Sequence, residues 1–195
     1  MHDARRRQRG LALPLVGAIL LLALVTAAST SDEAELAPLF TLPNLDGDAI
    51  SLADYRGSVV ILDFWATWCH LCVETFPAVQ SLSETYADQG TVLLVICLDK
   101  QGDTARRYLI ENDLRTDNVL WGSLTEAREV KGLFGVGGIA HTILIDRDGY
   151  IRYSGHPKNV TSGLVEEWLA GGPDSSPDSR SSLPPDEAAG APSGT

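Results

Sequence analysis

Residues 59–72 read VVILDFWATWCHLC and join an apolar run to a pair of cysteines. Residues 59–64 are apolar except for one carboxylate, and such a run is typical of a strand buried on both faces of a sheet. From residue 72 to residue 89 the apolar side chains follow helical spacing, and Gly90 then provides a stop signal. We therefore predict a buried strand that leads directly into a helix, with both cysteines at the junction.

Two residues separate Cys69 from Cys72, which places both sulfur atoms on the first helical turn within disulfide reach. Unpaired N–H groups at a helix N-terminus lower the pKa of a nearby thiol, and the thiolate is the reactive form of cysteine. We predict that Cys69 is the exposed nucleophile and that Cys72, one turn deeper, resolves the mixed disulfide. The alternative is half of a structural zinc site, which needs a second pair of ligands at similar spacing. The other cysteine and histidine candidates, which form no such pair, are Cys97, His70, His141 and His156.

Asp63 lies six residues before Cys69, inside the apolar run. A lone carboxylate is costly to bury, and burial raises its pKa. A raised pKa would suit Asp63 to exchange a proton with Cys72. The alternative is that Asp63 lies at a strand end that reaches solvent.

A second apolar run, residues 91–98 (TVLLVICL), predicts another buried strand and therefore a parallel strand–helix–strand crossover. The turn at Asp148-Gly149, between apolar residues 142–145 and 150–154, predicts a β-hairpin. The fold class that follows is α/β, with a central sheet flanked by helices. The remaining expected elements are an added N-terminal β-hairpin within residues 40–52 and helices at 103–112, at 125–134 and from Thr161 or Ser162.

The two ends of the chain differ in composition from the middle. Residues 1–28 combine four arginines with an uncharged apolar run from residue 11, which predicts a signal peptide or membrane anchor and an exported protein. In residues 171–195, Gly, Pro and Ser occupy 15 of 25 positions, which predicts a disordered tail. A single domain is expected over residues 36–170.

The chain carries 15 Lys and Arg against 26 Asp and Glu, a formal net charge of -11. A nucleic-acid-binding protein needs a basic face, so this balance argues against that class. Residues 29–170 alone contain 10 basic and 21 acidic residues, so the acidity belongs to the expected domain. We expect partners that dock at Cys69 to be neutral or basic.

The cysteine motif, preceded by FTLPNLDGDAISLADYRG and followed by GGIAHTILIDRDGYIRYSG, resembles the thioredoxin superfamily. The similarity is greatest to the extracytoplasmic TlpA-like thiol-disulfide oxidoreductases, whose domain is also called a redoxin or AhpC/TSA-type domain, and it covers residues 36–170. The resemblance implies a thioredoxin fold with a central mixed sheet, a redox-active disulfide between Cys69 and Cys72, no cofactor and no metal. It also implies protein dithiol or disulfide substrates and a membrane or soluble thiol reductant, for a monomer in the periplasm or on the outer face of the membrane.

The family usually has a cis-proline before the strand at residue 142, where this chain has Ala140. That proline helps hold the substrate beside the disulfide. Because a non-proline cis bond costs about 2.5–4 kcal/mol, we expect the Ala140 loop to be either strained or trans. Trp65 and Trp68 are expected to shield the redox site and fill the core, and Cys97 is expected to pack as a small buried residue. The candidate substrate-binding residues are Trp68, His70, Leu71, Ala140 and His141.

The leading functional hypothesis is an exported thiol-disulfide oxidoreductase that acts as a reductant, for example in cytochrome c maturation. One alternative is a thiol peroxidase of the AhpC/TSA type, although Thr67 stands two residues before Cys69 and the peroxidase pattern has Thr three residues before Cys. The other is a non-catalytic module that binds copper or zinc through Cys69, Cys72 and His141.

Overall fold

The structure is a computed structural model that describes residues 34–172, and within that range a five-stranded mixed sheet has the order β5-β4-β3-β6-β7. Strands β3, β4 and β5 are parallel to one another, β6 runs antiparallel to β3, and β7 runs antiparallel to β6. Their bounds are β3 (Val59–Trp65), β4 (Thr91–Cys97), β5 (Val119–Leu120), β6 (His141–Ile145) and β7 (Ile151–Gly155).

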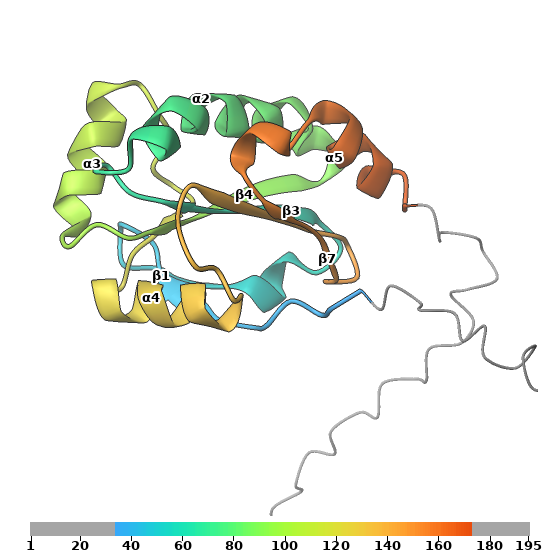
Figure 1. Cartoon of the computed structure of the whole chain (residues 1–195), viewed down its shortest axis with the longest axis horizontal. Coiled ribbons are helices and arrows are strands. Elements are labelled where there is room, and N and C mark those ends of the chain that lie inside the picture. Colours follow the sequence, from blue (N-terminus) through green and yellow to red (C-terminus); the bar gives the residue numbers. More distant parts are fainter. Residues whose placement is uncertain (1–33, 173–195) are drawn as a thin grey trace, which may run out of the picture. The chain divides into compact units, whose positions relative to one another are not determined.

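Helices cover both faces of this sheet. Their bounds are α2 (His70–Thr85), α3 (Gly102–Glu111), α4 (Leu124–Leu133) and α5 (Ser162–Leu169). In Figure 1, α2 and α5 lie over one face and α4 lies over the other. The predicted central sheet flanked by helices is therefore confirmed, as is the parallel crossover from β3 through α2 to β4.

The expected N-terminal hairpin is also present. Strands β1 (Thr41–Pro43) and β2 (Ala49–Ser51) pair antiparallel and form a small sheet of their own. The chain beside this hairpin is bonded to the edge of the main sheet, because Leu45 N donates to Val119 O and Trp121 N donates to Pro43 O, at 3.0 and 2.8 Å. The hairpin therefore covers the β5 edge of the main sheet.

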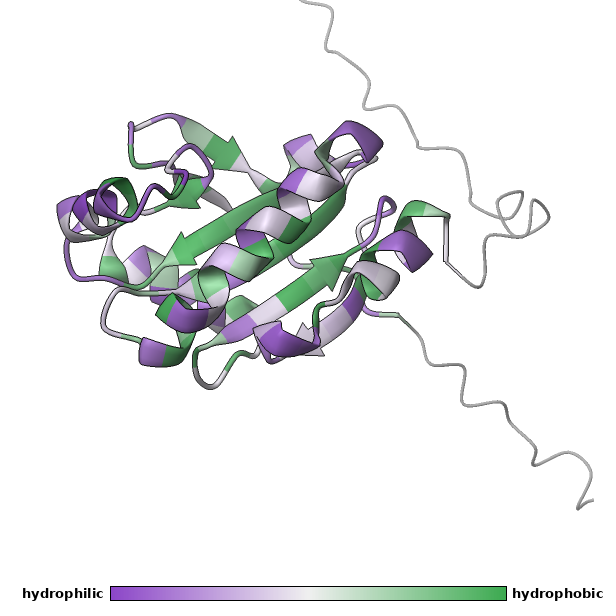
Figure 2. Cartoon of the chain, turned by 90° about the horizontal axis from the view of Figure 1, so that it is seen from above, coloured by the Kyte–Doolittle hydropathy of each residue, from purple (hydrophilic) through white to green (hydrophobic). Residues whose placement is uncertain are grey.

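Strand β3 forms the centre of the core. All seven of its residues are buried, and it is paired with β4 on one side and with β6 on the other. Figure 2 shows the central strands as hydrophobic, whereas the helices alternate between hydrophilic and hydrophobic residues. Buried strands sandwiched between amphipathic helices account for the continuous apolar runs in the sequence.

Some element boundaries differ from those predicted. The predicted helix at 72–89 is α2 followed by a separate 3-10 turn over Ala87–Gln89, and Gly90 ends that turn with φ +91°. Strand β5 was not predicted, because two residues are too few to show a period. The start of α4 was predicted at Thr125, but Ser123 caps the helix by accepting from Glu126 N, and the helix begins at Leu124.

The predicted leader, residues 1–28, lies outside the described residues, as does nearly all of the predicted tail at 171–195. Within residues 34–172, no helix has both the length and the apolar character needed to cross a membrane.

The central position of β3 gives a stability prediction. Ile61 on β3 is fully buried, whereas Ile110 on α3 is 65% exposed. We expect Ile61→Ala to lower the free energy of unfolding by about 2–5 kcal/mol, because it leaves a cavity in the core. Ile110→Ala, the matched control, should change it little. Urea denaturation measures both changes, and equal losses for the two variants would contradict this description of the core.

Candidate active site

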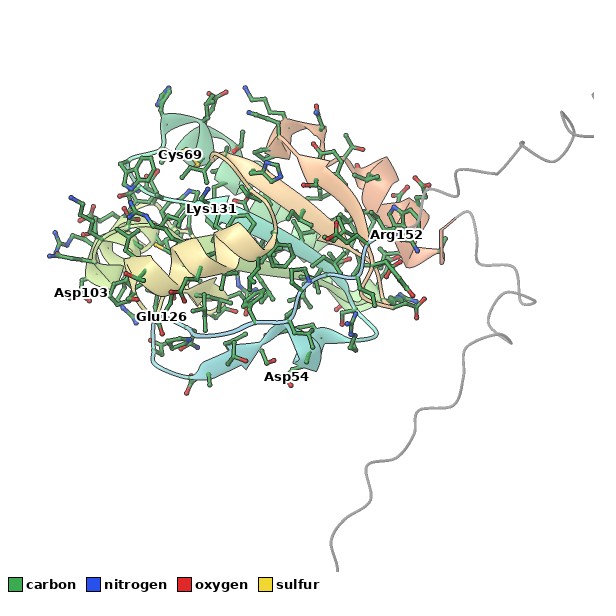
Figure 3. The ribbon with its side chains drawn as sticks, turned by 60° about the horizontal axis from the view of Figure 1, so that its bottom comes forward. Asp54, Cys69, Asp103, Glu126, Lys131 and Arg152 are labelled. Atoms are coloured by element: carbon green, nitrogen blue, oxygen red, sulfur yellow. A yellow bond between two sulfur atoms is a disulfide. The ribbon has the colours of Figure 1, made fainter. Side chains whose placement is uncertain are left out.

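The two cysteines lie at the junction where β3 leads into α2. Figure 3 labels Cys69 at this junction. A disulfide joins Cys69 and Cys72, whose Cα atoms are 5.2 Å apart. Cys69 is the N-cap of α2, and its Sγ accepts a hydrogen bond of 3.2 Å from Cys72 N. Because the first turn of α2 contains no acidic residue, the positive end of the helix dipole acts on the Cys69 sulfur without opposition from that turn.

The two sulfur atoms differ in their access to solvent. Cys69 is 8% exposed and Cys72 is 1% exposed, so Cys69 is the more accessible of two largely covered residues. Cys72 Sγ lies 3.9 Å from the carbonyl oxygen of Phe64, the residue that follows Asp63 on β3. The order of depth is the one expected of an attacking and a resolving cysteine, although Cys69 is less exposed than the sequence suggested.

Asp63 is 2% exposed, so the alternative in which it reaches solvent is wrong. Residues two apart on a strand share a face, and Trp65 packs against Phe76 of α2, with ring centroids 5.4 Å apart. Asp63 therefore faces the helix that carries Cys72.

The carboxylate of Asp63 has one side-chain hydrogen bond. Thr142 on β6 pairs with Asp63 in the sheet, and its Oγ1 donates to Asp63 Oδ1 at 2.6 Å. Burial raises the pKa of Asp63 to about 7, and the hydrogen bond from Thr142 opposes this rise because it favours the charged form. Asp63 is therefore able both to accept and to release a proton near neutral pH.

A second buried carboxylate fixes the segment before Cys69. Asp99, which follows β4 and is 3% exposed, accepts from Thr67 N at 3.0 Å and from Thr67 Oγ1 at 2.7 Å. Its backbone oxygen accepts from Trp121 Nε1 at 2.9 Å. Neither Asp99 nor Thr67 was predicted to belong to the site. The signal available was a carboxylate directly after the second buried strand.

Cys97 is fully buried on β4, as expected of a packing residue. Its Sγ lies 3.5 Å from Asp99 Oδ2. Burial raises the pKa of the Cys97 thiol far above its ordinary value, so this thiol stays protonated and unreactive.

The loop before β6 lies beside the cysteines, because His141 pairs with Phe64 at the end of β3. The peptide bond between Ile139 and Ala140 is cis, so the expectation of a trans bond is wrong. Lys131 on α4 holds the loop, since its Nζ donates to the carbonyl oxygens of Val136 and, at 3.0 Å, Gly137.

His141 does not complete a metal site with the cysteines. Its Nε2 hydrogen-bonds Ser154 Oγ on β7 at 2.8 Å, and burial, together with the charge of Lys131, lowers its pKa. Across residues 34–172, no three Cys, His, Asp or Glu side chains gather closely enough to hold a metal ion. The structure therefore does not assemble the proposed site of Cys69, Cys72 and His141.

The surface around Cys69 is apolar and exposed. Trp65 is fully buried, as expected, but Trp68 is 66% exposed, so the expectation that it fills the core is wrong. Trp68 lies in the turn before the helix cap, outside the sheet, where no layer of the core reaches it. Leu71 is 45% exposed and His70 is also exposed. Three of the candidate substrate-binding residues thus surround Cys69 on the open surface.

Comparison with known proteins identifies the family to which this chain belongs. The AhpC/TSA family matches residues 34–154. The thiol-disulfide oxidoreductase ResA of Bacillus thuringiensis (strain Al Hakam) is 28% identical over 115 residues, covering 59% of this chain and 64% of that protein. The thioredoxin-like protein YneN of Bacillus subtilis (strain 168) is 31% identical over 139 residues, covering 70% of this chain and 78% of that protein. The chain therefore spans slightly less than two thirds of the length of ResA.

A solved structure with the same architecture is a DsbE-like thiol:disulfide interchange protein from Chlorobium tepidum. Its TM-score is 0.63 at 29% identity, and the similarity covers 71% of this chain and 98% of that one. The predicted thioredoxin fold is thereby confirmed. The chain belongs to the AhpC/TSA family and is a TlpA-like member of the thioredoxin superfamily.

Proposed function

We propose that this protein is an exported thiol-disulfide oxidoreductase that reduces protein disulfides through Cys69 and Cys72. The observation that carries the proposal is the Cys69–Cys72 disulfide at the start of α2, with Cys69 the more accessible sulfur. The names of the relatives, thiol-disulfide oxidoreductase and thiol:disulfide interchange protein, support the same chemistry.

In the reducing direction, the protein starts as a dithiol. The Cys69 thiolate attacks a disulfide of the substrate, so that a bond from Cys69 to the substrate forms while the substrate S–S bond breaks. The released substrate thiolate takes up a proton. Cys72 then loses its proton and attacks Cys69, which forms the Cys69–Cys72 disulfide and releases the second substrate thiolate. The substrate gains two electrons, the protein loses two, and a thiol reductant resets the site.

Asp63 accepts the proton of Cys72 in this scheme. Its carboxylate is buried on the α2 side of β3, and its pKa of about 7 leaves both protonation states populated near neutral pH. Thr142 orients the carboxylate through its 2.6 Å hydrogen bond. Asp99 and Thr67 act as positioning residues, because they fix the segment before Cys69 and touch no reacting atom.

We also propose that the protein works outside the cytoplasm, with residues 1–28 as a signal peptide or anchor. Exported proteins whose cysteines must be kept reduced are the substrate class that fits this location and direction. Cysteines that await haem in cytochrome c maturation are one example.

The roles of the cysteines give a direct prediction. With dithiothreitol as the terminal reductant, the wild-type protein should reduce insulin, and Cys69→Ser should abolish turnover because the nucleophile is lost. When the reduced protein is mixed with insulin without dithiothreitol, Cys72→Ser should accumulate a mixed disulfide between Cys69 and the substrate, because the resolving thiol is missing. Cys97→Ala, which removes the buried third cysteine, should retain turnover. Activity that persisted in Cys69→Ser, or peroxide consumption without insulin reduction, would contradict the proposal.

The role of Asp63 gives a pH prediction. The rate of the wild-type dithiol with insulin should rise with pH through about 7 as Asp63 ionises. Asp63→Asn should remove this inflection and slow the resolving step by about 100-fold, the usual minimum for loss of a proton acceptor. Thr142→Val should move the inflection to higher pH, because the hydroxyl that favours the charged form is gone, and Thr142→Ser should restore it. Stopped-flow measurement across pH tests all three variants.

Protein stability provides an independent check on the same group. The folded chain keeps a proton on Asp63 up to about pH 7, whereas the unfolded chain releases it near the ordinary pKa of 3.8. The free energy of unfolding of the wild type should therefore fall relative to that of Asp63→Asn as pH rises from 3.8 to about 7. A constant difference between the two proteins over this range would show that the pKa of Asp63 is not raised.

A further inference from the structure

A groove of about 180 Å³ is lined by Trp68, the residue next to Cys69 in the chain. The apolar side chains of its wall are those of Trp68, which precedes Cys69, Leu98 just after β4, Leu124 at the start of α4, and Ile139 of the cis peptide. Lys131 of α4 also lines the groove, and Figure 3 labels both Lys131 and Cys69, the neighbour of the lining residue Trp68. A substrate segment next to the attacked disulfide would meet this groove.

The groove is cationic in an acidic protein. Arg128 and Lys131 both line it, and among its described lining residues there is no carboxylate. By contrast, residues 34–172 contain 10 basic and 19 acidic residues. The local charge is thus opposite to that of the surrounding chain, which the whole-chain charge count could not reveal.

Arg128 is the available cation of the pair. Lys131 already donates to the carbonyl oxygens of Val136 and Gly137, whereas Arg128 is exposed and has no hydrogen bond or ion pair within residues 34–172. Positions three and four residues away on α4 hold no acidic side chain that could pair with it. Like charges at Arg128 and Lys131, three residues apart on a helix, repel each other. An anion bound in the groove would relieve that repulsion.

We propose that the groove selects partner proteins whose cysteine is flanked by apolar and acidic residues, with Arg128 binding the acidic side chain. This inference rests on the proposed function and adds a substrate class to it. The apolar wall holds the segment next to the substrate cysteine, and Arg128 determines its preferred charge. The exchange chemistry is the one already described, with Cys69 forming the mixed disulfide.

The test uses synthetic peptides with one intramolecular disulfide, apolar neighbours, and Asp, Ser or Lys flanking the cysteines. The rate constant for oxidation of the reduced full-length protein by each peptide is divided by that peptide's rate with dithiothreitol, which removes its intrinsic reactivity. For the wild type we expect the order Asp, Ser, Lys, with steps of about two- to five-fold at low salt, as for exposed ion pairs. The steps should shrink as ionic strength rises.

Two charge-reversal variants distinguish binding in the groove from the effect of the protein's overall charge. Arg128→Glu should invert the order, so that the Lys peptide reacts fastest. Arg107→Glu makes the same charge change at an exposed position on α3 outside the groove, and it should keep the wild-type order.

Three outcomes would overturn the inference. Equal normalised rates for the three wild-type peptides would show that charge is not selected. A wild-type preference for Lys would show that the net charge of the protein, and not the groove, governs docking. Equal effects of Arg128→Glu and Arg107→Glu would show a long-range field without a site. Each of these outcomes differs from failure of the proposed function. In that case none of the peptides would oxidise the reduced wild-type protein, and the protein would not reduce insulin.

Discussion

A carboxylate buried in the central strand is the constraint on which the site depends. Every residue of β3 is buried, and the strand is paired on both sides, so Asp63 is almost fully shielded from solvent. Its single side-chain donor is the Thr142 hydroxyl, which does not offset the loss of solvent, and the pKa of Asp63 stays near 7. An apolar residue would stabilise this position more. The proposed proton transfer from Cys72 explains why a carboxylate occupies it.

One hydrogen bond, from Cys72 N to Cys69 Sγ, both caps the start of α2 and favours the thiolate form of Cys69. A helix begins with N–H groups that lack acceptors, and here the sulfur of Cys69 accepts one of them from Cys72. The N–H group that is capped in this way also stabilises negative charge on the sulfur. Thr67 and Asp99 fix the chain just before the cap, so the sulfur is held in place from both directions.

The sequence predicts those parts of the structure that are determined by residues close together in the chain. The apolar run of β3, the spacing of α2 and the cysteine pair are each contained within a few consecutive residues. The contacts that define the site are not local: Thr67 meets Asp99 across 32 positions, and Asp63 meets Thr142 across 79. Strand β5 is too short for a pattern and exists because Val119 and Leu120 pair with β4. The exposure of Trp68 depends on the direction of a turn, which composition does not specify. Asp99 was detectable in principle, because a carboxylate at the end of a buried strand is as unusual as Asp63 within one.

Asp63 and Asp99 show how the same side chain serves two purposes on neighbouring strands. Both are almost fully buried, so desolvation alone does not distinguish them. Asp99 accepts a backbone N–H and a hydroxyl from Thr67, and these donors fix its carboxylate as a clamp for the loop. Asp63 has only the hydroxyl of Thr142, and it faces the helix of the resolving cysteine. Two donors from one residue suit a carboxylate that remains in place, and a single donor suits one that must take up and release a proton. From the hydrogen-bond donors and the face of the sheet, we therefore propose a positioning role for Asp99 and proton exchange for Asp63.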